Sequence, residues 1–401
     1  MADLLERILS YAGERPELRQ RTDPAPRARP YRIVSVDDHV TEPPRMFEGR
    51  LPAALAADGP RVERDEHGHD WWVFDHDRVP LLGSDSWLGF EPGHAYLGQV
   101  NFDDLHPAVY DIDARVRYMD VVGVEASLCF ASAPFGFAGT RFLKMRDRDL
   151  GLASLRAYNE WHHEEWMSPH PGRIIGNQVT WLADPQIAAA EIRRNAERGF
   201  RALSFSENPE RLGLPSLYSD HWDPLFAACV ETDTVVNLHV GSSSATIVPS
   251  ADSAPAVLGA LFPINAMATA ADWLFTGIPL RFPDLKIALS EGGFGWVPIL
   301  IDRIEHMQRQ LDYSVQFGDL TPVDVLRRNF WFTTFNDEQS MSLRHLAGVD
   351  HIMVEVDYPH SDSTWPDSQE ILVRQFADVP DDEVAKMTHL NAIELYRLEL
   401  E

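Results

Sequence analysis

Eight short apolar runs rich in β-branched residues recur along the chain, and each run ends where a polar or charged residue appears. Patterns of helical period separate them, over 147–167, 185–198, 220–231, 296–311 and 381–398. Because parallel neighbours in a sheet need long crossovers, this alternation predicts a parallel sheet. The eight predicted strands are RIVSVDDH, VEASLCFA, RIIGNQVTWLAD, RALSFSE, TVVNLHVG, LKIALSEGG, NFWFTTFND and HIMVEVDYPH.

Eight strand and helix units predict an α/β fold, a (β/α)8 TIM-like barrel with reactive groups at the carboxyl ends of its strands. An open doubly wound sheet is the alternative, but its Gly-rich loop after the first strand is absent. Insertions at about 43–110 and 242–279 follow the first and fifth strands, so we expect both to lie over the barrel mouth. Residues 1–30 are expected to form a helical extension, with an amphipathic helix around Leu4 to Leu9, and 31–401 the barrel domain.

Side chains that can bind metal stand at the ends of five predicted strands. Asp37 and His39 are two residues apart and therefore point to the same side of a strand, whereas Asp38 points to the other. Taken singly, each position has an ordinary alternative, such as a turn, a hydrogen-bonded core histidine or a carboxylate that caps a helix. The full set comprises Asp37, His39, Glu207, His239, Glu291 and Asp357.

Three segments, VDDHVTEPP, NLHVGSS and DYPHSDSTWP, together resemble the amidohydrolase superfamily, over roughly Arg32 to Tyr396. More narrowly, they are similar to its branch of aminocarboxymuconate semialdehyde decarboxylase and related aromatic acid decarboxylases. The resemblance implies a metal-binding barrel in which Asp37, His39, His239 and Asp357 are ligands. His360 could orient a ligand or bind substrate.

Two glutamates depart from the decarboxylase pattern. Those relatives end the sixth strand in a catalytic histidine, where this chain has Glu291, and dinuclear superfamily members place a bridging ligand where this chain has Glu207. We therefore expect two divalent metal ions, with Asp37, His39 and Asp357 on one, His239 and Glu291 on the other, and Glu207 between them. Such a carboxylate-rich set favours Fe(II), with Mn or Zn as alternatives. In this it resembles the dinuclear non-haem iron monooxygenase of platensimycin and platencin biosynthesis.

Composition narrows the partners. The chain has a formal net charge of -27, which disfavours nucleic acid and membrane surfaces. Its two cysteines predict neither disulfides nor a zinc cluster, and without a secretion signal a cytoplasmic location is expected. A homodimer is compatible with the helical insertions. Aromatic residues could line a wide apolar cavity or simply pack the core, namely Trp71, Trp72, Trp87, Phe90, Tyr96, Phe135 and Phe137.

Three functions follow from these patterns. The favoured hypothesis is a di-iron monooxygenase that uses O2 on a large apolar substrate, terpenoid-like or acyl. The alternative is a metal-dependent hydrolase or nonoxidative decarboxylase of a carboxylic acid, in which Glu291 or Asp357 is the general base and His360 also contacts the substrate. A binding protein without catalytic activity would require all six strand-end positions to be coincidental.

Overall fold

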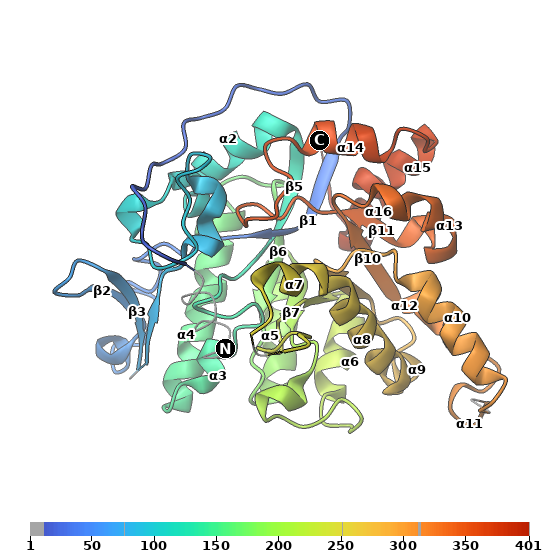
Figure 1. The fold of residues 1–401 in the computed structure, drawn as a ribbon. Helices are drawn as coiled ribbons and strands as arrows, with labels where there is room; N and C mark the ends of the chain where they lie inside the picture. Colours follow the sequence, from blue (N-terminus) through green and yellow to red (C-terminus); the bar gives the residue numbers. More distant parts are fainter. Residues whose placement is uncertain (1–11, 76, 251, 312–313, 401) are drawn as a thin grey trace.

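The computed structural model describes residues 12–75, 77–250, 252–311 and 314–400. Its centre is an eight-stranded parallel sheet in the order β1-β5-β6-β7-β8-β9-β10-β11, so that chain order and spatial order coincide (Figure 1). These strands are β1 (Ile33–His39), β5 (Val124–Phe130), β6 (Ile174–Val179), β7 (Phe200–Phe205), β8 (Val235–His239), β9 (Ile287–Ser290), β10 (Phe330–Thr334) and β11 (Ile352–Val354).

The first and last strands close this sheet into a barrel. The Asp357 amide donates to the Asp37 carbonyl at 2.8 Å, and the His39 amide donates to the Tyr358 carbonyl at 2.7 Å. These bonds join β1 to the segment that directly follows β11. The predicted (β/α)8 barrel is therefore confirmed, and every predicted strand occurs.

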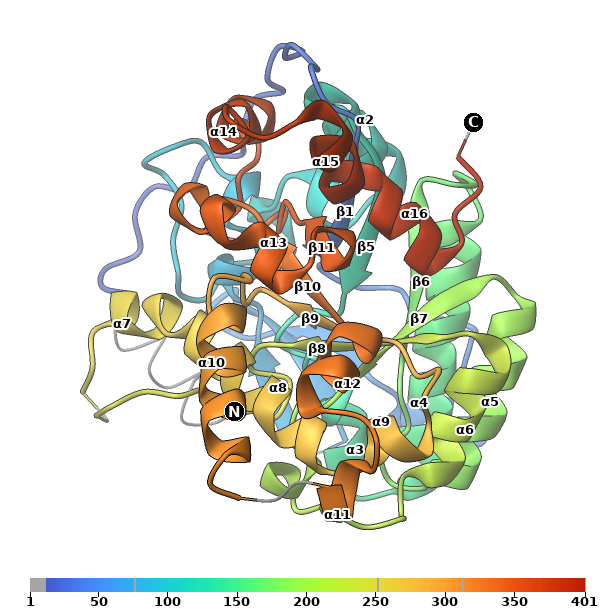
Figure 2. The same ribbon diagram turned by 90° about the vertical axis from the view of Figure 1, so that its right-hand side faces the viewer.

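Helices surround the barrel on the outside, as two views at right angles show (Figures 1 and 2). All five predicted helical segments are helical, and two of them continue as π-helices, over His162–Met167 and Lys386–Leu390. The α-helices are α2 (Ile112–Val122), α3 (Thr140–Lys144), α4 (Arg148–Trp161), α5 (Pro185–Glu197), α6 (Asp223–Thr232), α7 (Pro255–Ala260), α8 (Phe262–Phe275), α9 (Ile278–Arg281), α10 (Val297–Gln308), α11 (Ser314–Phe317), α12 (Pro322–Asn329), α13 (Arg344–Ala347), α14 (Ser368–Gln375), α15 (Asp381–Ala385) and α16 (Asn391–Tyr396).

Both predicted insertions have structure of their own. The first contains an antiparallel sheet of β2 (Arg61–Arg64), β3 (Asp70–Phe74) and β4 (Asp77–Pro80), which lies to one side of the barrel in Figure 1. Its 3-10 segment Gly83–Gly89 contacts the barrel mouth, because the Leu88 amide donates to the Pro359 carbonyl at 3.0 Å. The second insertion contains α7 and α8. The domain boundaries that we expect from the sequence stay a prediction.

The N-terminal segment runs over the outside of the barrel as an extended chain from residue 12 to the start of β1 (Figure 1). It is held by backbone bonds from Arg21 to Gly89 and from Arg27 to Val121. The amphipathic helix predicted around Leu4 to Leu9 lies outside the described residues.

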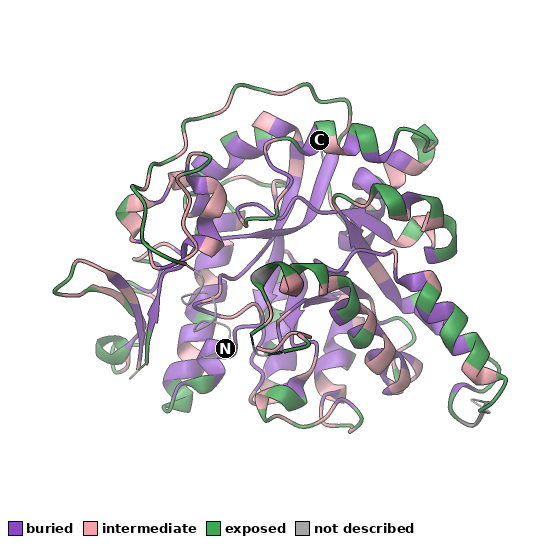
Figure 3. Ribbon diagram, viewed as in Figure 1, coloured by how far each residue is buried: buried purple, intermediate pink, exposed green. Residues whose placement is uncertain are grey.

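Burial follows the barrel, as Figure 3 shows: the strands are buried, whereas the outer faces of the helices are exposed. Strand β1 is buried along its whole length, although it carries two aspartates and a histidine. Charged side chains at full burial need partners or a metal ion. In the part of the chain that the structure describes, no helix combines the length and the apolar character needed to cross a bilayer.

Candidate metal centre

The carboxyl end of β1 brings Asp37 and His39 to the inside of the barrel mouth. Both side chains are fully buried, at 0% exposure. Asp38 points to the other side of the strand, as its place in the alternation predicts, and there it accepts hydrogen bonds from the Tyr358 amide at 2.9 Å and from the Ser127 hydroxyl. Alternation along one strand thus separates a hydrogen-bonded aspartate from one that faces the mouth.

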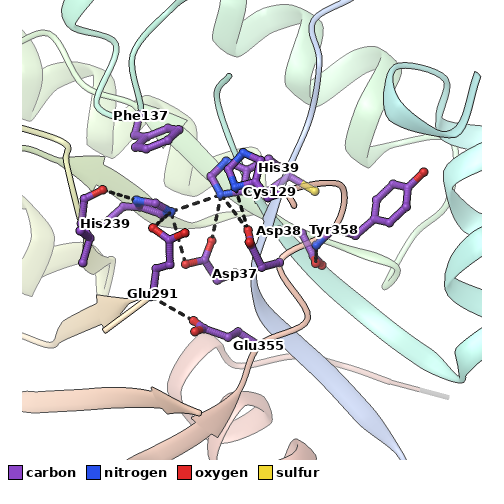
Figure 4. Close-up of polar contacts among 12 residues, drawn as sticks. Asp37, Asp38, His39, Cys129, Phe137, His239, Glu291, Glu355 and Tyr358 are labelled. Atoms are coloured by element: carbon purple, nitrogen blue, oxygen red, sulfur yellow. Dashed lines mark hydrogen bonds and ion pairs between the residues drawn. The ribbon is translucent and has the colours of Figure 1, made fainter. Parts of the chain in front are cut away.

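Side chains from three further strand ends meet this pair (Figure 4). The Nε2 atoms of His39 and His239 are 3.2 Å apart. Asp37 Oδ1 lies 3.5 Å from His39 Nε2, and Asp37 Oδ2 lies 3.6 Å from His239 Nε2. Asp357 Oδ1 is 3.3 Å from His39 Nε2, and Glu291 Oε2 is 3.6 Å from His239 Nε2. The structure therefore brings five of the six predicted ligands together.

The hydrogen-bonding state of these atoms fits a metal ion. His239 Nδ1 donates to the Val240 carbonyl at 2.7 Å, which leaves a lone pair on the Nε2 atom that faces His39. Both oxygens of Asp37 are buried and have no hydrogen-bond partner. Two facing imidazole nitrogens beside an unpartnered carboxylate satisfy one another poorly, but they suit a divalent cation.

Burial sets the protonation of this cluster in the absence of metal. Burial and the charges of Glu355 and Asp357 raise the pKa of Asp37 well above its usual range. Burial and the neighbouring His360 lower the pKa of His39 to about 4, and burial also lowers that of His239. Both histidines are therefore neutral at pH 7, the form that binds metal.

Glu291 and Asp357 adopt a backbone conformation that L-residues rarely use. Their φ angles are 62° and 59°, in the left-handed region, and both residues follow a barrel strand directly or closely. Such strain persists only where surrounding structure enforces it, and it concentrates at functional sites. Its presence at two of the predicted ligands supports a functional role for this end of the barrel.

His360 and Phe137 complete the surroundings of the imidazoles. The ring of His360 stacks on His39 with centroids 3.7 Å apart, and its Nδ1 lies 3.0 Å from Asp357 Oδ1. Although burial opposes the charged form, Asp357 raises the pKa of His360 to about 9. Phe137 packs against His239 at 4.2 Å and His39 at 5.0 Å, so one wall of the site is apolar.

Glu207, the sixth predicted ligand, lies beside this group with its carboxylate already occupied. Its Oε1 accepts from the Gly241 amide at 3.1 Å and from the Ser243 hydroxyl at 2.8 Å. Its Oε2 accepts from the Asn265 amide at 2.6 Å and from the Thr269 hydroxyl at 3.2 Å. A bridging role for Glu207 stays a prediction, and four hydrogen bonds count against it.

Two carboxylates near the site were missed in the sequence. Glu355 is buried inside the barrel and its Oε2 accepts from the Glu291 amide at 3.1 Å. Asp362 has an oxygen within 4.8 Å of oxygens from Glu291 and Asp357. The predicted strand HIMVEVDYPH holds Glu355 two residues before Asp357, so alternation along it could have given Glu355. Asp362 lies in a loop, where no periodic signal exists.

Several of the aromatic residues that could line a cavity pack the core instead. Trp72, Phe90 and Phe135 are buried at 1%, 1% and 0% exposure, and Trp72 and Phe135 contact each other with ring centroids 5.0 Å apart. Of the aromatic residues predicted to line a cavity, Phe137 is the one whose ring contacts the histidines. Core packing therefore explains the buried members of this aromatic group better than the lining of a cavity does.

Known proteins of the same fold include several decarboxylases. An amidohydrolase from Mycobacterium avium subsp. paratuberculosis matches with a TM-score of 0.70 and 24% identity, over 92% of this chain and 100% of its own. The 5-carboxyvanillate decarboxylase of Novosphingobium aromaticivorans, in complex with manganese, matches with a TM-score of 0.63 and 17% identity over 92% and 97%. The 2,6-dihydroxybenzoate decarboxylase from Rhizobium matches with a TM-score of 0.63 and 18% identity over 91% and 98%.

One curated relative matches over a shorter segment. Decarboxylase yanB of Aspergillus niger is 32% identical over 108 residues, which are 25% of this chain and 28% of the relative. The match therefore spans less than a third of that protein. The resemblance to the platensimycin monooxygenase stays a prediction.

A family model described as Amidohydrolase matches residues 65–398, which is most of the chain. This match agrees with the barrel and covers two of the three segments that resemble the superfamily, NLHVGSS and DYPHSDSTWP. The chain belongs to the amidohydrolase family.

Proposed function

We propose that this protein is a metal-dependent decarboxylase, which releases CO2 from a carboxylic acid without an oxidant. The observation that carries the proposal is the meeting of Asp37, His39, His239 and Asp357 at the barrel mouth, with unpartnered atoms facing one another. The decarboxylase names among structures of the same fold support this reaction class. The sequence alone indicated a decarboxylase as part of the alternative to a monooxygenase, and we now favour it.

The four residues would hold one divalent ion through two neutral imidazoles and two carboxylates. When bound, such an ion would bind the substrate carboxylate and an adjacent oxygen and offset their negative charge. A mixed set of nitrogen and oxygen ligands suits Mn, Fe or Zn. Manganese is present in the related 5-carboxyvanillate decarboxylase, which makes Mn(II) the first ion to test, although the sequence favoured Fe(II).

Loss of CO2 leaves an electron pair on carbon, and a proton must replace the lost group. His360 is placed for this task, because it stacks on His39 and is oriented by the contact between its Nδ1 and Asp357 Oδ1. We assign proton delivery to His360. The net reaction is RCOO⁻ plus H⁺ giving RH plus CO2, which needs no redox partner.

The environment also suggests a substrate class. Phe137 covers the two imidazoles on one side and would pack against a flat apolar ring while excluding water. An aromatic acid with a hydroxyl beside its carboxylate would present an apolar ring to Phe137 and two oxygens to a metal ion. This narrows the apolar substrate that we expect from the sequence.

A di-iron monooxygenase remains the second candidate function. The observation in its favour is the carboxylate-rich surroundings, since Glu291 occupies the position where decarboxylase-like relatives have a histidine. Three of the four similar proteins bear decarboxylase names, so oxygen chemistry takes second place. Its dependence on O2 separates the two candidates.

The test is product formation with and without oxygen. Manganese-loaded protein is incubated with 2,6-dihydroxybenzoate or 5-carboxyvanillate in sealed anaerobic and aerobic vials, and CO2, the decarboxylated ring and O2 consumption are measured. We expect CO2 and ring product in equal amounts at the same rate in both vials. His360→Ala should slow release at least 100-fold, whereas the exposed His345→Ala is the matched control and should not. A hydroxylated product that forms only with O2 would overturn the proposal.

A further inference from the structure

Three carboxylates from two loops converge beside the proposed metal centre. Glu291 follows β9, and Asp357 and Asp362 follow β11, and one oxygen from each lies within 4.8 Å of the others. Among the ion pairs of the described residues, none joins a Lys or Arg side chain to any of the three. His360, whose Nδ1 lies 3.0 Å from Asp357 Oδ1, offsets one of these negative charges, and the remaining like charges at this spacing repel one another unless protons or a further cation intervene.

Asp357 has one oxygen to spare for a second cation. Its side chain is 2% exposed, and neither carboxylate oxygen has a hydrogen-bond partner. The short contacts with His39 Nε2 and His360 Nδ1 both use Oδ1. Oδ2 is therefore a buried acceptor without a partner among the described residues. A carboxylate that bridges two metal ions offers one oxygen to each, and Asp357 has Oδ1 beside His39 and Oδ2 outside that contact.

The side of the centre on which a second ion would lie also follows from the contacts. Both carboxylate oxygens of Glu207 accept hydrogen bonds, four in all, from Gly241, Ser243, Asn265 and Thr269. Among the described residues, no basic side chain forms an ion pair with Asp362, which is exposed at the edge of the centre. The acceptors that remain free are thus on the Asp362 side.

The geometry points to a second divalent cation site made of Glu291, Asp357 and Asp362, which rests on the proposed first site because the two share Asp357. Three carboxylates and no nitrogen form a hard, all-oxygen ligand set, which favours Mn(II), Mg(II) or Fe(II) over Zn(II). Because Asp362 is exposed, water would fill the remaining coordination positions. The second ion should therefore bind more weakly than the first and exchange more readily.

The site differs from the dinuclear arrangement that we expect from the sequence. There, Glu207 bridges the two ions and His239 and Glu291 hold the second one. Here Asp357 is the bridge, Asp362 is the added ligand, and Glu207 is a hydrogen-bonded neighbour. The two arrangements predict opposite outcomes for two conservative variants, Asp362→Asn and Glu207→Gln.

The experiment is a titration of the metal-free full-length protein with Mn(II), in which free Mn(II) is measured by electron paramagnetic resonance. The wild type should bind two ions, the second at least 10-fold more weakly, and the filled protein should show the spectrum of a spin-coupled Mn(II) pair. Asp362→Asn should bind one ion and lose the coupled spectrum. Glu207→Gln, the matched control, should still bind two.

Each outcome decides one point. A wild type that binds one ion at saturation, or an Asp362→Asn variant that keeps two coupled ions, overturns the second site while leaving the first intact. A wild type that binds none overturns the first site and with it the proposed function. Because Asp362 is exposed, its substitution should leave the fold unchanged, and a melting curve without metal checks this.

Discussion

Replacing Asp37 by Asn should stabilise the protein without metal and abolish its stabilisation by metal. Asp37 is fully buried, both of its oxygens lack hydrogen-bond partners, and burial with the charges of Glu355, Asp357 and Glu291 raises its pKa. In metal-free protein its charge is thus a cost to folding. Asparagine keeps the shape of the side chain and removes the charge.

The magnitude follows from Coulomb's law. Two carboxylates about 6 Å apart repel by about 3 kcal/mol at an effective dielectric constant of about 20. Partial protonation relieves some of this repulsion, so we expect Asp37→Asn to raise the metal-free stability by about 2 kcal/mol. With about 2.1 cal/mol/K of unfolding entropy per residue, a chain of 401 residues gains about 1 °C in Tm per kcal/mol. The metal-free variant should therefore melt about 2 °C above the wild type.

In the presence of metal, Asp37→Asn should lower the Tm relative to the wild type instead of raising it. At a concentration about 1,000 times its Kd, a bound ion stabilises the fold by about 4 kcal/mol, which is about 5 °C here. Asp37→Asn removes a ligand, and a loss of affinity of about 1,000-fold would reduce this gain almost to zero. The assay is differential scanning calorimetry of both proteins in chelator and in Mn(II).

Asp38→Asn is the matched control, since Asp38 is the neighbouring buried aspartate. Burial raises its pKa to about 6, but unlike Asp37 it accepts hydrogen bonds, from the Tyr358 amide and the Ser127 hydroxyl, and faces Arg115. Asparagine would keep these contacts only in part, so its replacement should destabilise the protein with and without metal. The shift that Mn(II) causes should survive in this variant. If Asp37→Asn lowers the metal-free Tm, or keeps the shift caused by Mn(II), Asp37 is structural and the reasoning fails.

Three further predictions concern groups around the centre. Burial raises the pKa of Glu42 from 4.5 to about 7, so the folded state holds a proton that the unfolded state releases. The free energy of unfolding in chelator should therefore fall by up to about 3 kcal/mol as the pH rises from about 4.5 to above 7. Glu42→Gln should reduce this pH dependence in urea unfolding at pH 5 and pH 8, and an unchanged dependence would contradict the assignment. Phe135→Ala removes a ring at 0% exposure that contacts Trp72 and Phe74, and should cost about 3–5 kcal/mol in the same assay; a loss below about 1 kcal/mol would show that the insertion packs only loosely on the barrel. Glu355→Gln can still accept from the Glu291 amide, so Mn(II) affinity should change less than about 10-fold, and loss of the ion would instead make Glu355 a ligand.

The barrel was predictable because its signal is local and repeated. A strand buried on both faces is a short continuous apolar run, and a parallel sheet requires a helix after each run. The small sheet β2 to β4 was expected only as part of an insertion, since its strands are short and include charged residues such as Arg64 and Asp70. Helix α2, which lies between the first insertion and the second predicted strand, was not predicted.

For the candidate centre, too, the features that follow from local sequence patterns were predictable. Alternation along a strand placed Asp37 and His39 on one face, and the carboxyl ends of parallel strands brought His239, Glu291 and Asp357 to the same mouth. These conclusions need only the period of a strand and the direction of a parallel sheet. The sequence by itself therefore determined the fold, the position of the centre and the residue types that form it.

Only the tertiary structure decided which oxygens are free to bind an ion. Glu207 and Asp362 are both acidic residues near strand ends, and nothing local distinguishes them as ligands. Donors from α8, 58 and 62 residues away along the chain, occupy the carboxylate of Glu207, whereas no basic side chain pairs with Asp362 among the ion pairs of the described residues. Hydrogen bonding between distant segments depends on their packing in three dimensions, and this is why the pattern of residues along the chain could not supply it.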